Sequence, residues 1–285
     1  MLDQRRQPSM MTKPEPKTAQ DSWMALPLWS VLIRIAVMIG VIVSALLLAA
    51  ELSNSADPTA YGTLLTRILS GLAISALVIT VIVVLVRWAG RRPLSVVGFT
   101  TAAGDLRAFG LGIAVWTVPA AATFFVLALL GNPLQITAPA AEFWLALGLL
   151  FLAVLLTEAI PEELVFRGYV SAVLAERLSP WWVIGVQTVL FVAFAVLLPG
   201  DINPLDVSLF AAMGFVLGYA RLVTGSVWTA VGIHVAFQTA SQLVFTHQVI
   251  EFGGSPVLAM VALGAVPFTA AAIMIPIVVA WKTHD

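Results

Sequence analysis

The chain has 285 residues, of which 60% are hydrophobic and only 10% are charged, with a net charge of −1. A soluble domain averages roughly 25% charged residues, so the mean hydropathy of +1.01 indicates that lipid is the main solvent of this protein. The near-zero net charge, without a long basic tract, argues against a nucleic-acid partner. The absence of cysteine excludes disulfides, a catalytic thiol and metal sites built from cysteine.

Residues 1–21 are polar and rich in Pro, Lys, Gln and Arg, a composition typical of a disordered tail. Residues 22–285 are predicted to form a single transmembrane helical domain, because apolar stretches fill this part of the chain. A bilayer core of about 30 Å needs roughly 20 apolar residues in helical form. Such segments occur at 27–50, 68–88, 108–130, 142–160, 181–198, 205–223, 227–245 and 257–281.

The basic residues outside these segments follow one side of the membrane, as cytoplasmic loops do. With eight spans, Lys and Arg gather before the first span, in alternate loops, and after the last span. The opposite loops carry Asp57, Asp201, His247 and Glu251, with Arg67 as their one basic residue. We therefore predict an all-α transmembrane bundle of about eight spans with both termini in the cytoplasm. An interfacial belt is predicted from the tryptophans near span ends: Trp29, Trp88, Trp181, Trp182, Trp228 and Trp281.

The most concentrated chemical signal is the sequence Pro-Glu-Glu-Leu-Val-Phe-Arg-Gly at 161–168, where the fourth predicted span ends. Glu163 and Arg167 are four residues apart, so they can pair across one helical turn. Glu158 and Glu162 have the same spacing, which can bring their carboxylates together on one face. Ionisable groups near the bilayer core usually face the bundle interior or an aqueous cavity. A carboxylate in such a place is a candidate general base.

Pro161 lacks the amide hydrogen that would bond to the carbonyl of Thr157, so we expect it either to kink the fourth span or to start a new helix. Residues 162–178 are predicted to continue as an amphipathic helix at the cytoplasmic boundary. The alternative for the whole motif is an ordinary helix start, where proline and acidic residues favour the first turn. The low charge of the chain and the position at a span end favour the functional interpretation.

His234 lies inside the seventh predicted span, and Gln238 follows one helical turn later. Both can face one cavity and donate hydrogen bonds to a developing oxyanion. The sequence does not separate this from a second interpretation, in which a core histidine is joined by Gln238, Ser241 and Gln242 as hydrogen-bonding groups between helices. Interhelical hydrogen bonding also accounts for Gln187 in the fifth span.

The motif Glu162-Glu163-x-x-x-Arg167, followed by Gly-Tyr, resembles the signature of the CPBP family of intramembrane proteases, the CAAX-processing and bacteriocin-immunity (Abi) proteins. Residues 225–234, which end in His234, resemble the last motif of that family. The resemblance implies a CPBP-like core at 141–242. It makes Glu162 the base that activates water, Glu163 and Arg167 its structural partners, and His234 an oxyanion donor. Gln238 stands in the place of the final Asn of the family.

One residue departs more seriously from the family pattern. The Phe-x-x-x-His motif of the family aligns with 191–195, so Ala195 replaces a histidine that takes part in water activation. Alanine can neither polarise water nor bind a metal. Because His234 is then the single histidine within the predicted spans, a zinc site is doubtful, and we expect water activation by Glu162 without a tightly held metal.

The leading hypothesis is an intramembrane endopeptidase that hydrolyses a peptide bond of a membrane-associated, CAAX-like or other substrate. Its expected partners are membrane lipid and a peptide or membrane-protein substrate, and the family implies a bacterial plasma membrane. The alternative is a catalytically inactive relative that binds peptide or lipid in an immunity or scaffolding role. A transporter with a proton relay is a third hypothesis, but the sequence shows no inverted repeat that would support it.

Overall fold

The structure of the protein is a computed structural model that describes residues 28–52, 57, 60–197, 204–247 and 249–282. All eight predicted spans correspond to helices, so the all-α class is confirmed. The predicted tail at 1–21 and Asp201 lie outside the described residues. The long helices are α1 (Leu28–Leu52), α2 (Tyr61–Val83), α3 (Ala102–Leu129), α4 (Ala140–Val154), α7 (Pro180–Leu197), α8 (Pro204–Thr224), α9 (Val227–Phe245) and α11 (Val266–Lys282).

Several helices are extended by tighter or wider turns. A π-helical turn, η1 (Val84–Ala89), continues α2, and a short 3₁₀ turn, η2 (Leu94–Val97), precedes α3. The helix α10 (Pro256–Met260) passes through η5 (Val261–Ala265) into α11. The helix α4 continues without interruption to Leu174, through η3 (Leu155–Ala159), α5 (Ile160–Glu163), η4 (Leu164–Val170) and α6 (Ser171–Leu174). We call this continuous helix, Ala140–Leu174, the motif helix.

By length and composition, six helices in the described part of the chain can cross a membrane. They are the helices that contain α1, α2, α3, α8 and α11, together with the motif helix. The helix α7 is shorter, and α9 is not among the six. The chain is therefore a multi-pass membrane protein, while the number of spans and the side of each terminus stay predictions.

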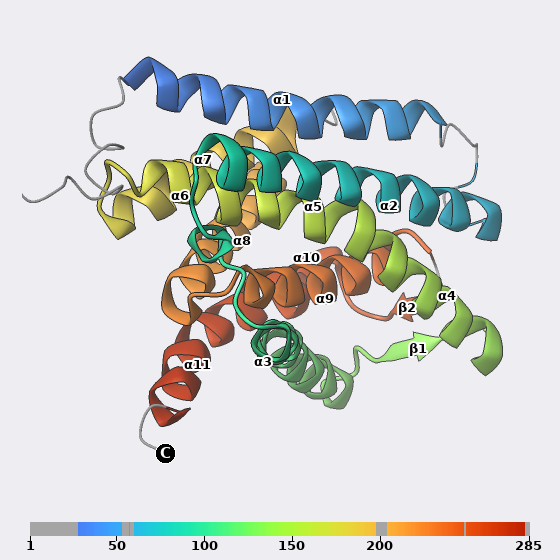
Figure 1. The fold of residues 1–285 in the computed structure, drawn as a ribbon. Helices are drawn as coiled ribbons and strands as arrows, with labels where there is room; N and C mark the ends of the chain where they lie inside the picture. Colours follow the sequence, from blue (N-terminus) through green and yellow to red (C-terminus); the bar gives the residue numbers. More distant parts are fainter. Residues whose placement is uncertain (1–27, 53–56, 58–59, 198–203, 248, 283–285) are drawn as a thin grey trace, which may run out of the picture.

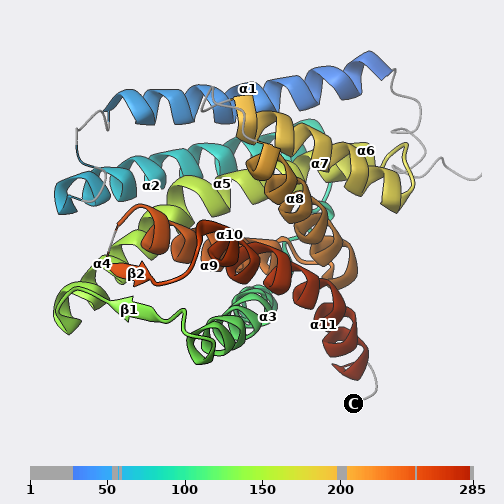
Figure 2. The same cartoon turned by 180° about the vertical axis from the view of Figure 1, so that it is seen from behind.

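The helices are arranged around α9. From one side of the molecule to the other, the order is α1, α2, the motif helix, α9 and α3, as both views show (Figures 1 and 2). The helices α8 and α11 close the remaining side against α3 and α9. Because α9 has partners all round, it buries residues on all its faces, including His234. The helix α9 combines apolar residues with polar ones such as Thr229, His234 and Thr239, and its central position buries both kinds.

Two glycines allow α9 and α3 to lie in direct backbone contact. A Cβ atom on Gly232 would meet the carbonyl oxygen of Phe109, and one on Gly112 would meet the carbonyl oxygen of Thr229. Small residues at such crossings let helix backbones approach closely inside a membrane. The glycine pair therefore sets the separation of the helix that carries His234 from α3.

Gly232→Ala is expected to destabilise the protein by about 1–3 kcal/mol, the usual cost of forcing extra atoms into a packed core. The added methyl group would meet backbone atoms, which cannot turn aside. The measurement is unfolding of the purified protein by titration with sodium dodecyl sulfate. Gly148→Ala, on the exposed side of α4 with nothing within 4 Å of its Cβ position, is the matched control. Equal stability of the two variants would contradict the close contact.

Two loops pair as strands, which the sequence did not predict. The strand β1 (Leu134–Ile136) follows α3, and β2 (Ile250–Phe252) follows α9, and the two are antiparallel. Glu251 of the predicted seventh loop is opposite Gln135. The pairing holds the third and seventh loops at one end of the molecule, in agreement with their predicted placement on the same side.

Five of the six tryptophans predicted for the interfacial belt are exposed, namely Trp29, Trp88, Trp181, Trp182 and Trp281. Trp228 differs from these five in being half-buried. Its indole lies edge-on against Phe99 and Phe109, with ring centroids 6.1 and 6.5 Å away. Trp228 therefore anchors the start of α9 to the region around α3.

Candidate active site

The motif helix carries the acidic motif inside the molecule and not on its surface. Pro161 does not start a new helix, because the helix is continuous on both sides of it. The wider π-turn η3 ends two residues before Pro161, whose missing amide hydrogen removes one regular helical bond. A second π-turn, η4, follows the motif, and such turns occur frequently at functional sites.

The prediction of an amphipathic boundary helix over 162–178 is wrong. Every residue from Glu163 to Val170 is buried. The sequence pattern was misleading because the helix is enclosed by α1, α2, α7, α8 and α9 over this stretch. Only the last turns, with Arg177 exposed, reach the molecular surface.

Glu163 is the centre of a buried polar chain that links two helices. Its Oε1 atom accepts a hydrogen bond from Nη1 of Arg167 at 2.9 Å, which confirms the predicted pairing across one turn. The same oxygen lies 2.9 Å from Nδ1 of His234 on α9. Glu163 and Arg167 are completely buried, and His234 is 3% exposed. Buried charges need such partners, since an unpaired charge is costly away from water.

Arg167 is held by further contacts from α7 and α8. Its guanidinium carbon lies 4.2 Å from the ring centroid of Phe191, a cation–π geometry. Its Nη2 atom donates to the carbonyl of Gly214 at 3.4 Å, and Nε2 of Gln187 donates to the same carbonyl at 2.9 Å. Gln187 thus makes the interhelical bond expected of it. The roles of Phe191 and Gly214 were missed, although Phe191 opens the stretch aligned with Phe-x-x-x-His.

Glu162 is the carboxylate of the motif that is left without a hydrogen-bonding partner among the described residues. It is half-buried, beside fully buried neighbours. The ionisable groups that surround it are His234, Glu158, Glu163 and Arg167. The resemblance pairs His234, as the oxyanion donor, with Glu162, as the base. The structure bonds His234 to Glu163 instead and leaves Glu162 electrostatically coupled to it.

Glu158 does not turn toward Glu162 but belongs to a second cluster. Nη2 of Arg67, on α2, donates to Glu158 Oε1 at 2.8 Å, and Arg67 Nη1 donates to Gln242 Oε1 at 3.2 Å. The Gln242 amide donates back to Glu158 Oε1 at 3.1 Å. Arg67 therefore contradicts its prediction as a loop residue: it is part of an interhelical cluster that ties α2, η3 and α9 together. Gln242 makes the interhelical bond expected of it.

Arg67→Gln is expected to lower the free energy of unfolding by about 1 kcal/mol, because the Arg67–Glu158 pair is partly exposed and such pairs contribute little. The side chains are 20% and 21% exposed. Detergent-induced unfolding measures the change, with Arg107→Gln on the exposed face of α3 as control. A decrease of several kcal/mol in the free energy of unfolding would contradict this expectation and show that the cluster stabilises the fold more than its exposure indicates.

The two positions that depart from the family pattern differ in their surroundings. Gln238 lies on α9 one turn after His234, is half-buried, and makes no side-chain hydrogen bond to any other described residue. Ala195 on α7 is partly buried and packs against the hydrophobic core. On the same helix, the rings of Phe191 and Phe194 lie 5.4 and 5.2 Å from that of Phe166. In this stretch α7 presents aromatic rings to the motif helix.

The donor set does not fit a zinc site. Zinc sites need three or four nitrogen, sulfur or oxygen ligands. Among the described residues there is no group of three or more His, Asp or Glu side chains placed to hold a metal ion. The Glu163 oxygen that contacts His234 is also bonded to Arg167, so these two residues form an ion-pair chain and not a ligand pair.

Comparison with known protein families tests the resemblance to the CPBP intramembrane proteases. Residues 142–240 match the family described as type II CAAX prenyl endopeptidase Rce1-like. Over these residues the chain is similar to that family. The resemblance to the CPBP intramembrane proteases is therefore confirmed over this region, which contains the motif helix from its first turn and α9 as far as Ala240. Comparisons with curated proteins and with solved structures found no match.

Proposed function

We propose that the protein is an intramembrane endopeptidase in which Glu162 activates the attacking water. At family level, the Rce1-like region supports a CAAX-type intramembrane protease. The observation that carries the residue assignment is the buried chain Arg167–Glu163–His234 beside Glu162. Arg167 and His234 both contact Glu163 Oε1 and tie this carboxylate into the buried chain. Glu162 is only half-buried and makes no hydrogen bond to another described residue, so it is the carboxylate of the motif that we assign to the substrate.

The proposed reaction is ordinary general-base hydrolysis. The Glu162 carboxylate accepts a proton from water as the water oxygen attacks the peptide carbonyl carbon. The tetrahedral intermediate carries its negative charge on the former carbonyl oxygen. When the C–N bond breaks, Glu162 returns its proton to the leaving nitrogen, which yields a carboxylic acid and an amine; the acid then transfers its proton through water to the amine, leaving a carboxylate and an ammonium group. No external oxidant or cofactor enters this balance.

His234 supplies the oxyanion donor in this proposal. Because Nδ1 faces Glu163, the ring is fixed in orientation and its Nε2 atom is the one presented to the substrate. Gln238, one turn further along α9, offers its amide as a second donor. Since Nδ1–H donates to the Glu163 carboxylate, Nε2 donates to the oxyanion only when His234 is protonated. The protonated ring also balances charge, because Glu162 and Glu163 then face two cations, His234 and Arg167.

The proposed substrates are peptides attached to or inserted in the membrane, of CAAX type or another, and the proposed location is a bacterial plasma membrane. The test uses the full chain in lipid nanodiscs with quenched fluorescent peptides that end in CAAX-type sequences, with and without a farnesyl group. Cleavage between defined residues, identified by mass spectrometry, supports the proposal. Folded protein that cleaves none of these peptides contradicts it.

A non-catalytic role is the second candidate, and one observation favours it. The position of the family histidine is Ala195, and the neighbouring face of α7 is aromatic. Under this alternative, the same peptides bind without being cut. Stoichiometric peptide binding, with no product after prolonged incubation, would favour a binding role in immunity or scaffolding over hydrolysis.

A further inference from the structure

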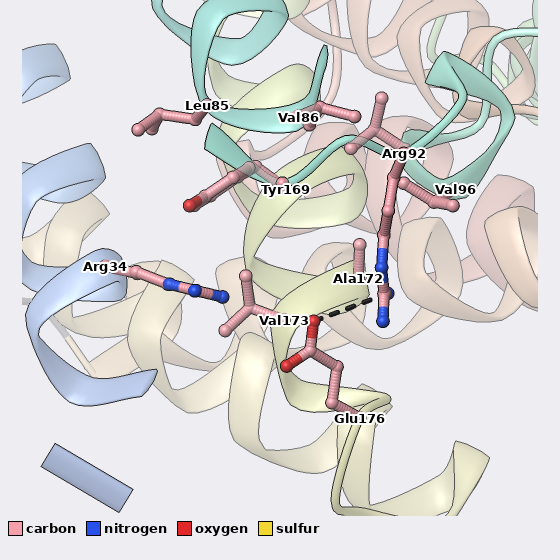
Figure 3. A pocket seen from close by; sticks show the side chains of 11 residues that line it. Arg34, Leu85, Val86, Arg92, Val96, Tyr169, Ala172, Val173 and Glu176 are labelled. Carbon is pink, nitrogen blue, oxygen red and sulfur yellow. Dashed lines mark ion pairs between the residues drawn. The ribbon is translucent and has the colours of Figure 1, made fainter. Parts of the chain in front are cut away.

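A separate pocket lies where α1, the η1–η2 stretch and α6 meet. Arg34, Arg92 and Glu176 place charged groups along its lining, and Tyr169 adds a hydroxyl (Figure 3). The other lining residues are apolar or glycine: Leu85, Val86, Gly90, Val96, Val97, Ala172 and Val173. None of the five candidate active-site residues lines this pocket. The pocket is therefore distinct from the candidate active site.

Glu176 carries an acceptor oxygen that the described residues leave unused. Its side chain is only 8% exposed, and its Oε1 atom lies 3.4 Å from Nη1 of Arg92. Its Oε2 atom is buried and has no hydrogen-bond partner among the described residues. Buried polar atoms in native proteins nearly always have a partner. The second oxygen thus points to a ligand that brings an N–H or O–H donor.

The charges around Glu176 indicate that the ligand also carries an anionic group. Arg34 and Arg92 extend toward Glu176 from different elements, as Figure 3 shows, and both interact with it electrostatically. Burial raises the pKa of Glu176, and the guanidinium groups of Arg92, Arg34 and Arg177 oppose that shift. With two cations and one anion, the lining has an excess of positive charge. A ligand that joins an anionic group to a hydrogen-bond donor would satisfy both features.

The position of the pocket favours a lipid. Lys and Arg outside the spans place this end of the molecule on the predicted cytoplasmic side. Trp29 and Trp88, close in sequence to Arg34 and Arg92, are 64% and 80% exposed, as expected at a membrane interface. Exposed apolar side chains lie close in sequence to the lining residues, at Ile33 and Val37 on α1 and at Val84 in η1. Acyl chains can lie along such a surface.

We propose that this pocket binds the headgroup of phosphatidylethanolamine from the cytoplasmic leaflet. The phosphate lies between the guanidinium groups of Arg34 and Arg92, and the ammonium group donates to Glu176 Oε2. The apolar wall at Val86 and Val173 contacts the glycerol region. Phosphatidylcholine carries the same charges but has no N–H donor, so it leaves the Glu176 oxygen unsatisfied. A peptide carboxylate matches the arginines but brings no cation for Glu176.

The test measures lipid retention by the full chain. The purified protein in detergent is titrated with phosphatidylethanolamine, phosphatidylcholine or phosphatidylglycerol of matched acyl chains, and bound lipid is counted by native mass spectrometry. Phosphatidylethanolamine is expected to bind about 10-fold or more tightly than phosphatidylcholine, since a hydrogen bond to a charged group contributes about 1.5–3 kcal/mol. Glu176→Gln should remove most of this preference, and Arg34→Gln should weaken the binding of all three lipids.

Arg107→Gln is the matched control, because Arg107 is an exposed arginine on α3 and lies outside the pocket lining. This variant should retain lipid as the wild type does. The proposal is overturned if the wild type does not distinguish the ethanolamine and choline lipids, or if Glu176→Gln keeps the full preference. Equal binding of phosphatidylglycerol, or complete displacement by a CAAX-type peptide, would also overturn it. If Glu176→Gln fails to fold, Arg34→Gln, on a different helix, supplies the decision.

Discussion

Glu162→Gln is expected to abolish peptide cleavage, with kcat lowered by about 10²–10⁴-fold, the range that a positioned general base contributes. Glutamine has nearly the shape of glutamate but cannot accept a proton from water. Because Glu162 makes no hydrogen bond to another described residue, its replacement removes the base without breaking a structural contact. The measurement is the initial rate of product formation from whichever fluorescent peptide the wild type cleaves.

Glu142→Gln is the matched control for this prediction. Glu142 lies in the first turn of the same motif helix and is exposed. Its substitution removes the same charge from the same helix, far from the buried chain. Activity lost equally in both variants would point to a general effect of charge. Full activity in Glu162→Gln would assign water activation to another group and remove the proposed mechanism.

The sequence predicted the helices well because each has a clear physical signature. A stretch of about 20 apolar residues has few alternatives to a helix in lipid. The pairing of Glu163 with Arg167 was equally accessible, since it depends only on helical spacing within one segment. The prediction of an amphipathic helix at the membrane boundary after Pro161 was wrong, because it depended on more than the local sequence. Whether a stretch is enclosed depends on neighbouring helices that local sequence does not show.

The partner of His234 depends on tertiary geometry. Glu162 and Glu163 are adjacent, and a change in the rotation or height of α9 decides which carboxylate meets the imidazole. That placement rests on the close contact of Gly112 with Gly232, which joins α9 to α3. Arg67 shows the same limit. Its position near a predicted span end favoured a loop, and only the packing of α2 against η3 reveals its bond to Glu158.

Arg167→Met is expected to cause the largest loss of stability, about 3–5 kcal/mol, the usual cost of removing one partner of a buried ion pair. Methionine keeps much of the apolar stem but removes the guanidinium group from Glu163, from the carbonyl of Gly214 and from the ring of Phe191. The free energy of unfolding in detergent measures the effect. Arg177→Met, an exposed arginine near the end of the same helical region, is the control and should change it little.

The double variant Glu163→Gln, Arg167→Met separates the ion pair from simple packing. If each single substitution leaves an uncompensated buried charge, the double variant is less destabilised than the sum of the two single variants. Strict additivity would mean that the residues act independently and would contradict the buried pair. The two single variants also differ in their effect on His234. It keeps its hydrogen bond to Glu163 in Arg167→Met but loses its anionic partner in Glu163→Gln. Cleavage should therefore suffer more from Glu163→Gln than from Arg167→Met at equal folded fraction, because the orientation of the proposed oxyanion donor depends on Glu163.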